Sequence, residues 1–227
     1  MFSLIIPTFN EEESIDATVN NAYNTLTHCR EEFEILVIND GSTDGTAAKL
    51  SQLQMPNLTV ISHPRNTGYS ASIKTGIRRA KGEILGITDA DGTYPIEQFP
   101  ALLKIMRDKD MDMVIGARIK KGVKIPIIRR PAKFIVNTLA NMLTGMNIPD
   151  LNSGMRIFTK KFALRFMHIY PQRFSFTITT TLAALTNDYL VEFVPIEYFK
   201  RQGTSSLSSG VNGLKNFIGF LGLIIRI

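Results

Sequence analysis

Short apolar runs alternate with helical patterns through the first half of this chain, and that alternation most constrains its fold. Runs rich in Ile, Leu and Val are followed by segments with apolar residues at helical spacing, such as Ile15, Val19, Ala22 and Leu26. Strands that alternate with helices in this way form a mostly parallel sheet with helices on both faces. We therefore expect a Rossmann-like α/β fold that binds its ligands at the carboxyl ends of the strands.

The expected elements continue to the last quarter of the chain. The predicted strands are 2–6, 35–38, 58–61, 84–88, 113–117 and 191–195. The predicted helices are 15–26, a helix after Asp44, 70–80, 95–107, 131–143, 160–168 and 175–186. Between two of these helices lies a segment that contains glycine and asparagine, residues 150–156.

Polar residues gather where the predicted strands end. The first strand runs into Pro7-Thr8-Phe9-Asn10-Glu11, the second into Asn39-Asp40-Gly41-Ser42 and the fourth into Asp89-Ala90-Asp91. Alternation along a strand places Asp89 and Asp91 on the same side. Two carboxylates that face one way repel each other, and Mg²⁺ or Mn²⁺ bound to phosphate oxygens relieves that repulsion. The alternative interpretation is an ordinary acidic turn, because Asp and Gly are common in turns.

Composition sets the broad class of protein. The chain has 227 residues, 44% of them hydrophobic and 20% charged, which is typical of a globular protein with a substantial core. Its single cysteine excludes an internal disulfide and fits a reducing compartment. The net charge of +6 favours anionic partners such as phosphates, acidic membrane surfaces or nucleic acid. No apolar stretch is long enough to span a bilayer by the length rule.

Two later regions leave alternatives open. Cations without any acid gather in 118–133, either as a solvated face or as a site for an anionic partner. Residues 214–227 are strongly apolar and suit either a buried terminal helix or an interfacial helix that leads into membrane spans. Other site classes are disfavoured, since the chain has no Gly-x-Gly-x-x-Gly or phosphate-loop motif and too few Cys and His residues for structural zinc.

The motifs carry a family resemblance over about residues 2–206. The strand-end motifs, together with Thr43-Asp44-Gly45-Thr46 and Asn66-Thr67-Gly68, resemble the family 2 glycosyltransferases with a GT-A fold. Gly116-Ala117-Arg118, the segment 150–156 and Lys200-Arg201-Gln202-Gly203-Thr204-Ser205 are similar to the polyprenyl-phosphate glycosyltransferases, which include the dolichol-phosphate mannose synthases. The resemblance implies a catalytic domain over 1–206, followed by the apolar segment 207–227.

The resemblance assigns roles to the strand ends. It implies that Asp89 and Asp91 are the catalytic pair and hold a divalent cation, Mg²⁺ or Mn²⁺, with Asp91 as the main ligand. The implied nucleotide-binding residues are Pro7, Thr8, Asn10, Glu11, Asp40, Asp89 and Ala90. Carboxylates and carbonyls can accept hydrogen bonds from a base and from ribose hydroxyls. The alternatives are a turn role for Asp40 and a helix N-terminal role for Glu11.

Positive residues are the implied binding site for the acceptor phosphate. The resemblance points to Arg118, Arg130, Lys133, Arg201 and Ser205. The sequence departs from the family at Thr93, where a metal-binding Gln is common, and at Ser206, where a Lys is common. These departures remove one cation and put the identity of the metal in doubt.

The implied reaction is sugar transfer from a UDP- or GDP-linked donor to a polyprenyl (dolichyl or undecaprenyl) phosphate at the cytoplasmic face of a membrane. A phosphate monoester is already anionic near neutral pH, so no general base is needed and inversion is expected. The alternative acceptor is a sugar hydroxyl of a glycan or lipid-linked oligosaccharide, which would need a base. Asp150 is the candidate base, or equally a structural turn residue. Nucleic acid is not expected as a partner, because the cations cluster in one loop without an aromatic platform.

Overall fold

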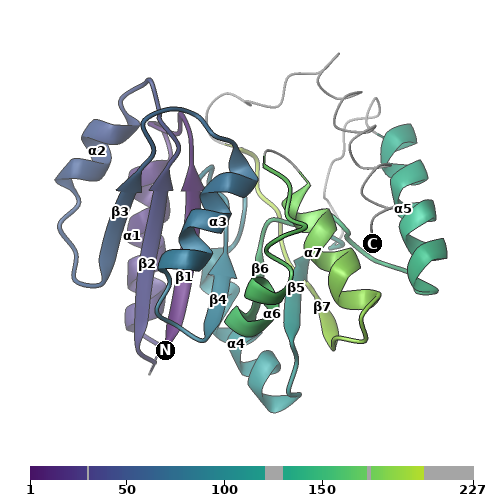
Figure 1. Cartoon of the computed structure of the whole chain (residues 1–227). Helices are drawn as coiled ribbons and strands as arrows, with labels where there is room; N and C mark the ends of the chain where they lie inside the picture. The colour runs from purple at the N-terminus through teal and green to yellow at the C-terminus, as the bar shows by residue number, and fades with distance from the viewer. Residues whose placement is uncertain (30, 121–129, 173–174, 202–227) are drawn as a thin grey trace.

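A seven-stranded sheet forms the centre of the molecule, in the order β3-β2-β1-β4-β6-β5-β7 (Figure 1). The computed structural model describes residues 1–29, 31–120, 130–172 and 175–201, without the side chains of residues 130–135. The strands are β1 (Phe2–Thr8), β2 (Phe33–Asn39), β3 (Leu58–Ser62), β4 (Ile84–Ile87), β5 (Met113–Ala117), β6 (Arg156–Thr159) and β7 (Val191–Pro195).

Most strand pairs are parallel. The pairs β1–β2, β2–β3, β1–β4 and β5–β7 run parallel, whereas β6 is antiparallel to both of its neighbours, β4 and β5. The parallel register joins Thr8 to Asn39, so β1 and β2 end at the same edge of the sheet. The predicted mostly parallel α/β sheet is confirmed, and all of the predicted strands are present within one to two residues of their expected ends.

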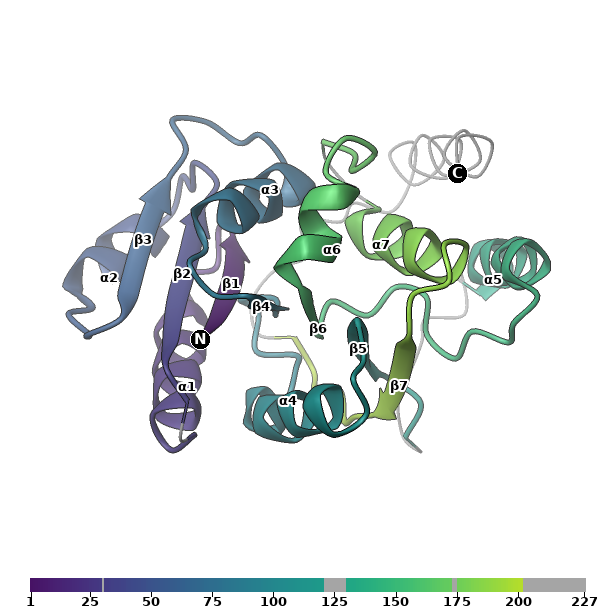
Figure 2. The ribbon, with the colours of Figure 1, turned by 60° about the horizontal axis from the view of Figure 1, so that its bottom comes forward.

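Helices cover both faces of the sheet, as predicted. They are α1 (Ile15–Thr27), α2 (Thr46–Gln52), α3 (Tyr69–Arg79), α4 (Phe99–Asp108), α5 (Arg130–Thr144), α6 (Lys160–Arg165) and α7 (Phe176–Leu185). Figure 2 shows α1 and α4 on one face and α3, α6 and α7 on the other. None of the helices in the described ranges is both long and apolar enough to cross a membrane.

Each face buries its own apolar core. On the α1 and α4 face, residues such as Val19 and Leu102 pack on Leu4, Val37 and Ile157. On the opposite face, Ile73 of α3 and Phe162 of α6 belong to the cluster that contains Ile5, Leu36 and Phe158 of the sheet. Strands that are buried on both sides read as continuous apolar runs, which is why the sequence pattern located them well.

The structure differs from the sequence interpretation at three places. Residues 156–159 form the antiparallel strand β6, because Ile157 and Phe158 fill opposite cores and Arg156 is buried between β6 and α7. The helix expected from Pro95 begins as a 3₁₀ turn, η1 (Ile96–Gln98), and becomes α-helical at Phe99. The helix expected over 160–168 ends at Arg165.

Candidate functional site

The loop after β1 is tied to the loop after β2. Asn10 adopts a positive φ of 55°, and its side-chain oxygen accepts from the Thr43 amide at 2.8 Å. The Asn10 amide donates to the Ser42 hydroxyl at 3.0 Å. The Glu11 amide donates to the Thr46 hydroxyl at 2.9 Å, at the start of α2. Because these bonds fix both strand ends together, the polar residues of β1 and β2 share one edge, as predicted.

Asp40 is buried and fully engaged by its own chain. Its carboxylate accepts from the amides of Thr67 (3.0 Å) and Gly68 (2.7 Å), from the Thr67 hydroxyl (2.6 Å) and from His63 Nδ1 (2.7 Å). Burial alone would raise the pKa of Asp40, but the hydrogen bonds from Thr67, His63 and Gly68 outweigh it and hold the pKa below its usual value. Asp40 therefore anchors the loop before α3, and its predicted contact with a nucleotide stays a prediction.

Asp89 lies just beyond β4 and is held by Tyr69 and Gly154. The Tyr69 hydroxyl, at the start of α3, donates to Asp89 Oδ1 at 2.9 Å. A Cβ atom added to Gly154 would lie only 2.8 Å from Asp89 Oδ2, so the loop before β6 approaches the carboxylate closely because it has a glycine there. Burial and the neighbouring charge of Asp91 raise the pKa of Asp89 to about 6.

Asp91 is 6% exposed and has a different partner on each oxygen. Thr93 donates to Oδ1 through its amide (3.1 Å) and its hydroxyl (2.6 Å). Arg201 donates to Oδ2 through Nη1 at 3.0 Å. The threonine that replaces the Gln common in the resembling family thus orients Asp91 instead.

Arg201 also binds Glu11, so that one guanidinium joins the loop after β1 to the acidic loop (Asp89-Ala90-Asp91). Burial raises the pKa of Glu11 to about 7, with Arg201 opposing the shift and Asp91 adding to it. The segment that carries Arg201 runs back along the acidic loop after β7, since the Phe199 amide donates to the Thr93 carbonyl at 2.9 Å. Arg201, predicted as a phosphate ligand, therefore lies among the carboxylates in this structure.

Arg118 follows β5 and forms a partly buried ion pair with the buried Asp150. Its Nε donates to Asp150 Oδ2 at 2.8 Å, its Nη2 to Oδ1 at 2.9 Å, and its amide to Oδ2 at 3.0 Å. Its guanidinium also lies over the Tyr198 ring, 5.2 Å from the centroid. Burial alone would lower the pKa of Arg118, but Asp150 holds it above the ordinary value. Asp150 is 2% exposed, so the structure favours its structural interpretation over the base.

The sequence analysis missed the role of Arg156, which is fully buried at the start of β6. Its guanidinium donates to the carbonyls of Ser153 and Thr177 and to the hydroxyls of Thr180 and Thr181. Burial lowers its pKa to about 10. This network fixes the loop before β6 to α7 and so keeps Gly154 against Asp89. The threonine-rich sequence of α7 was the available signal.

Several predicted site residues do not present side chains to solvent. Pro7, Thr8 and Ala90 are buried; the Thr8 hydroxyl donates to the Ile6 carbonyl, and the Ala90 carbonyl accepts from Thr18. The side chains of Arg130 and Lys133, the residue Ser205 and the segment 207–227 lie outside the described residues.

The carboxylate oxygens of the acidic loop suit a divalent cation that prefers oxygen ligands, such as Mg²⁺ or Mn²⁺, and that takes few of its ligands from the protein. In the described part of the chain, no group of three or more His, Cys, Asp or Glu side chains is arranged to hold a metal. Asp91 offers a rigid carboxylate, with Asp89 beside it, and Mg²⁺ or Mn²⁺ would take its other ligands from phosphate oxygens and water. The implied metal therefore fits at Asp91 together with a phosphorylated ligand.

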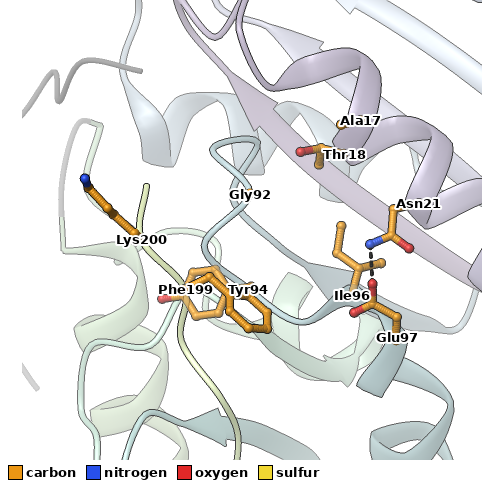
Figure 3. Close-up of a pocket in the computed structure, with 9 residues that line it drawn as sticks. All are labelled: Ala17, Thr18, Asn21, Gly92, Tyr94, Ile96, Glu97, Phe199 and Lys200. Carbon is orange, nitrogen blue, oxygen red and sulfur yellow. Dashed lines mark hydrogen bonds between the residues drawn. The ribbon is translucent and has the colours of Figure 1, made fainter. Parts of the chain in front are cut away.

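A separate pocket lies on the α1 side of the acidic loop (Figure 3). Tyr94 and Phe199 form one wall and α1 the other, where Asn21 hydrogen-bonds Glu97. Its volume of about 290 Å³ is at the lower end for small-molecule sites, and it contains none of the predicted site residues. We assign it no role.

Comparison with known proteins identifies relatives of this chain. The profile described as Glycosyl transferase family 2 matches residues 3–170. The low-salt glycan biosynthesis hexosyltransferase Agl6 of Haloferax volcanii is 27% identical over 218 residues, covering 94% of this chain and 51% of the relative. Polyprenol monophosphomannose synthase of Mycolicibacterium smegmatis is 29% identical over 221 residues, covering 92% of this chain and 81% of the relative. The chain thus spans about half the length of the first relative.

Solved structures share the fold. S. aureus TarS 1–349 in complex with UDP-GlcNAc has a TM-score of 0.73 at 21% identity, covering 98% of this chain and 65% of that chain. Glucosyl-3-phosphoglycerate synthase from Mycobacterium tuberculosis, in complex with Mn²⁺, UDP and glucosyl-3-phosphoglycerate, has a TM-score of 0.70 at 15% identity, covering 100% of this chain and 80% of that chain. These similarities confirm the predicted GT-A fold.

Proposed function

Because the chain belongs to glycosyltransferase family 2, we propose that it transfers a sugar from a nucleotide-sugar to a polyprenyl phosphate, with inversion at the anomeric carbon. The observation that carries this proposal is the pairing of two rims on one sheet edge. The acidic rim consists of Glu11, Asp89 and Asp91 at the ends of β1 and β4. The basic rim consists of Arg118 at the end of β5 and the loop 150–155. The carboxylates of the acidic rim suit a divalent metal that binds the donor diphosphate, and the guanidinium of the basic rim suits an anionic acceptor.

On the donor side, we assign the nucleotide to the ends of β1 and β2 and the diphosphate to Asp91. The Asn10 bridge and the Asp40 network hold these strand ends in place before any ligand binds. Asp89, oriented by Tyr69, is placed to accept from a ribose hydroxyl or to assist Asp91. A divalent cation bound there would supply positive charge to the departing diphosphate. The neighbour bound to Mn²⁺ and UDP supports this assignment, with either UDP or GDP as the leaving group.

On the acceptor side, the engagement of Asp150 favours a phosphate nucleophile over a sugar hydroxyl. A hydroxyl acceptor needs a base, and the carboxylate predicted for that role is ion-paired with Arg118. A phosphate needs cations and alignment instead. Nη2 of Arg118 also donates to the Asn152 carbonyl at 2.9 Å, which fixes the orientation of the guanidinium. Among the described residues Nη1 has no hydrogen bond, and we assign it to the anion. The relative named polyprenol monophosphomannose synthase supports this choice.

A membrane surface is the natural location for a polyprenyl phosphate, and we propose that the chain acts at the cytoplasmic face. The end of α5 and the loop after it expose Met142 (77%), Leu143 (40%) and Met146 (49%). Exposed apolar side chains suit contact with a bilayer surface.

A binding panel followed by a transfer assay tests the proposal. UDP and GDP, each with Mg²⁺ or Mn²⁺, should raise the melting temperature in a divalent-dependent way for one of the two nucleotides. Transfer from the matching nucleotide-sugar should then require undecaprenyl or dolichyl phosphate. Equal transfer to a glycan hydroxyl without polyprenyl phosphate would favour the alternative acceptor, and no stabilisation by either nucleotide would overturn the donor assignment.

A further inference from the structure

Arg201 occupies the centre of the acidic rim. Its Nη1 donates to Asp91 Oδ2 at 3.0 Å and its Nη2 pairs with Glu11 Oε1. Its Nε is buried and has no hydrogen-bond partner among the described residues. The arginine is thus held by two carboxylates from different loops, yet one of its donors is left unsatisfied. A buried donor of a purely structural arginine is expected to be paired.

The pairing uses the oxygen of Asp91 that a metal would need. Thr93 already donates twice to Oδ1, so Oδ2 is the oxygen free of Thr93, and that oxygen carries Arg201. A guanidinium and a divalent cation on the same carboxylate oxygen would repel each other strongly in this buried position. Metal and Arg201 therefore compete for Asp91.

A nucleoside diphosphate changes the balance of charge. The metal brings two positive charges to a rim that Arg201 already partly neutralises, so metal alone gains little there. A diphosphate adds anionic oxygens that can ligate the metal and also give the displaced guanidinium a bidentate partner. Arg201 can then leave the carboxylates without losing its hydrogen bonds.

We propose that Arg201 is a built-in counter-cation of the acidic rim, which keeps divalent metal out until a nucleoside diphosphate arrives and then transfers to phosphate. This inference rests on the proposed function, because it takes Asp91 as the metal ligand. It assigns Arg201 two successive partners, the carboxylates in the free protein and a phosphate in the loaded one. Donor and metal then bind together, and the Arg201 guanidinium changes partner at that step.

Calorimetric titration with Mn²⁺ alone, without nucleotide, tests the competition. Arg201→Gln should bind Mn²⁺ about tenfold more tightly than the wild type, because the competing charge is gone. Lys200→Gln is the matched control, since it removes the same charge one residue away from an exposed side chain. Equal gains in the two variants, or weaker binding in Arg201→Gln, would overturn the inference.

The same titration with UDP or GDP separates the inference from the function on which it rests. With the matching nucleotide the advantage of Arg201→Gln should disappear, because the wild-type arginine then pairs with phosphate. If the wild type fails to bind Mn²⁺ in the presence of UDP and also in the presence of GDP, both proposals fail. If it binds Mn²⁺ with nucleotide but Arg201→Gln gains nothing over Lys200→Gln without it, only the inference fails.

Thermal unfolding provides a check on folding. Without metal, Arg201→Gln should melt below the wild type, because Glu11 and Asp91 lose their shared cation, and Mn²⁺ should restore more of its melting temperature than it adds to the wild type. Arg201→Lys keeps the positive charge but loses the two-pronged geometry of the guanidinium. Its melting temperature without metal should therefore lie between those of the wild type and Arg201→Gln. A melting temperature of Arg201→Gln that Mn²⁺ leaves unchanged would count against the competition.

Discussion

The acidic and basic rims differ in how their charges are balanced. On the acidic rim, burial raises the pKa of Asp89 to about 6 and that of Glu11 to about 7, so the carboxylates there are undercompensated. On the basic rim, Arg118 has its own buried carboxylate, Asp150, and a ring beneath it. The comparison shows that the acidic rim has uncompensated negative charge that can attract a cation. The basic rim, in contrast, already has its charge paired and its side chains fixed before a ligand binds.

The largest effect is expected from the acidic rim. Asp91→Asn should lower sugar transfer by about 1,000-fold, because it removes the charge that the proposed metal needs. Steady-state transfer assays measure the loss, and circular dichroism should show an unchanged fold. Asp108→Asn, which removes a carboxylate from a surface pair with Lys104, should transfer normally. Activity of Asp91→Asn within tenfold of the wild type would remove the acidic rim from catalysis.

On the basic rim the main effect should be on stability. Asp150→Asn should lower the free energy of unfolding by about 3 kcal/mol, because it leaves the guanidinium of Arg118 without its buried partner. Urea denaturation measures this change. Glu192→Gln, in the exposed pair with Lys109, should cost less than about 1 kcal/mol. A stable Asp150→Asn protein that has lost transfer would instead identify Asp150 as the base and favour a hydroxyl acceptor.

Asp40, which follows β2 and lies outside the acidic rim, is a carboxylate whose charge is compensated by its own hydrogen bonds. Asp40→Asn should destabilise the protein by about 2 kcal/mol, through hydrogen bonds that the carboxylate makes to Thr67, Gly68 and His63. Because the folded pKa of Asp40 lies below its usual value of 3.8, this stability is present above about pH 4 and is lost as the pH falls through the folded pKa.

Unfolding curves from pH 2 to 7 check the Asp40 prediction. The difference between wild type and Asp40→Asn should be constant above about pH 5 and should narrow at lower pH. Asp16→Asn, which removes an exposed partner of Lys49, should follow the wild type throughout. A difference that widens on acidification would mean that Asp40 is not held ionised by its network.

The smallest effect concerns the orientation of Asp89. Tyr69→Phe should reduce the transfer efficiency by about tenfold, mainly through the KM of the donor, because Asp89 Oδ1 loses its hydroxyl donor. The separate kcat and KM values are the measurement. Tyr23→Phe on α1, where the ring packs on Phe33, is the control. An equal loss in both variants would indicate a general effect of removing a tyrosine hydroxyl.

The sequence predicted the parallel half of the fold and its acidic rim well, because buried strands and their polar ends follow one another along the chain. It missed β6, since a four-residue strand that opens with a buried arginine has no periodic pattern. Contacts between residues far apart in the sequence could not be predicted either. Nothing in the residues around Arg201 shows that it meets Glu11, 190 positions away, and nothing around Asp40 shows that Thr67 and Gly68 fold back onto it.

The single reversed strand sets the spacing of the whole edge. Neighbouring strands lie about 4.8 Å apart, so inserting β6 between β4 and β5 separates their tips by about 10 Å. Because β6 runs the other way, it begins at that edge, and Gly154 just before it lets the backbone approach the Asp89 carboxylate closely. Under the proposed function, this gap is the room for the sugar between the donor side at Asp91 and the acceptor side at Arg118.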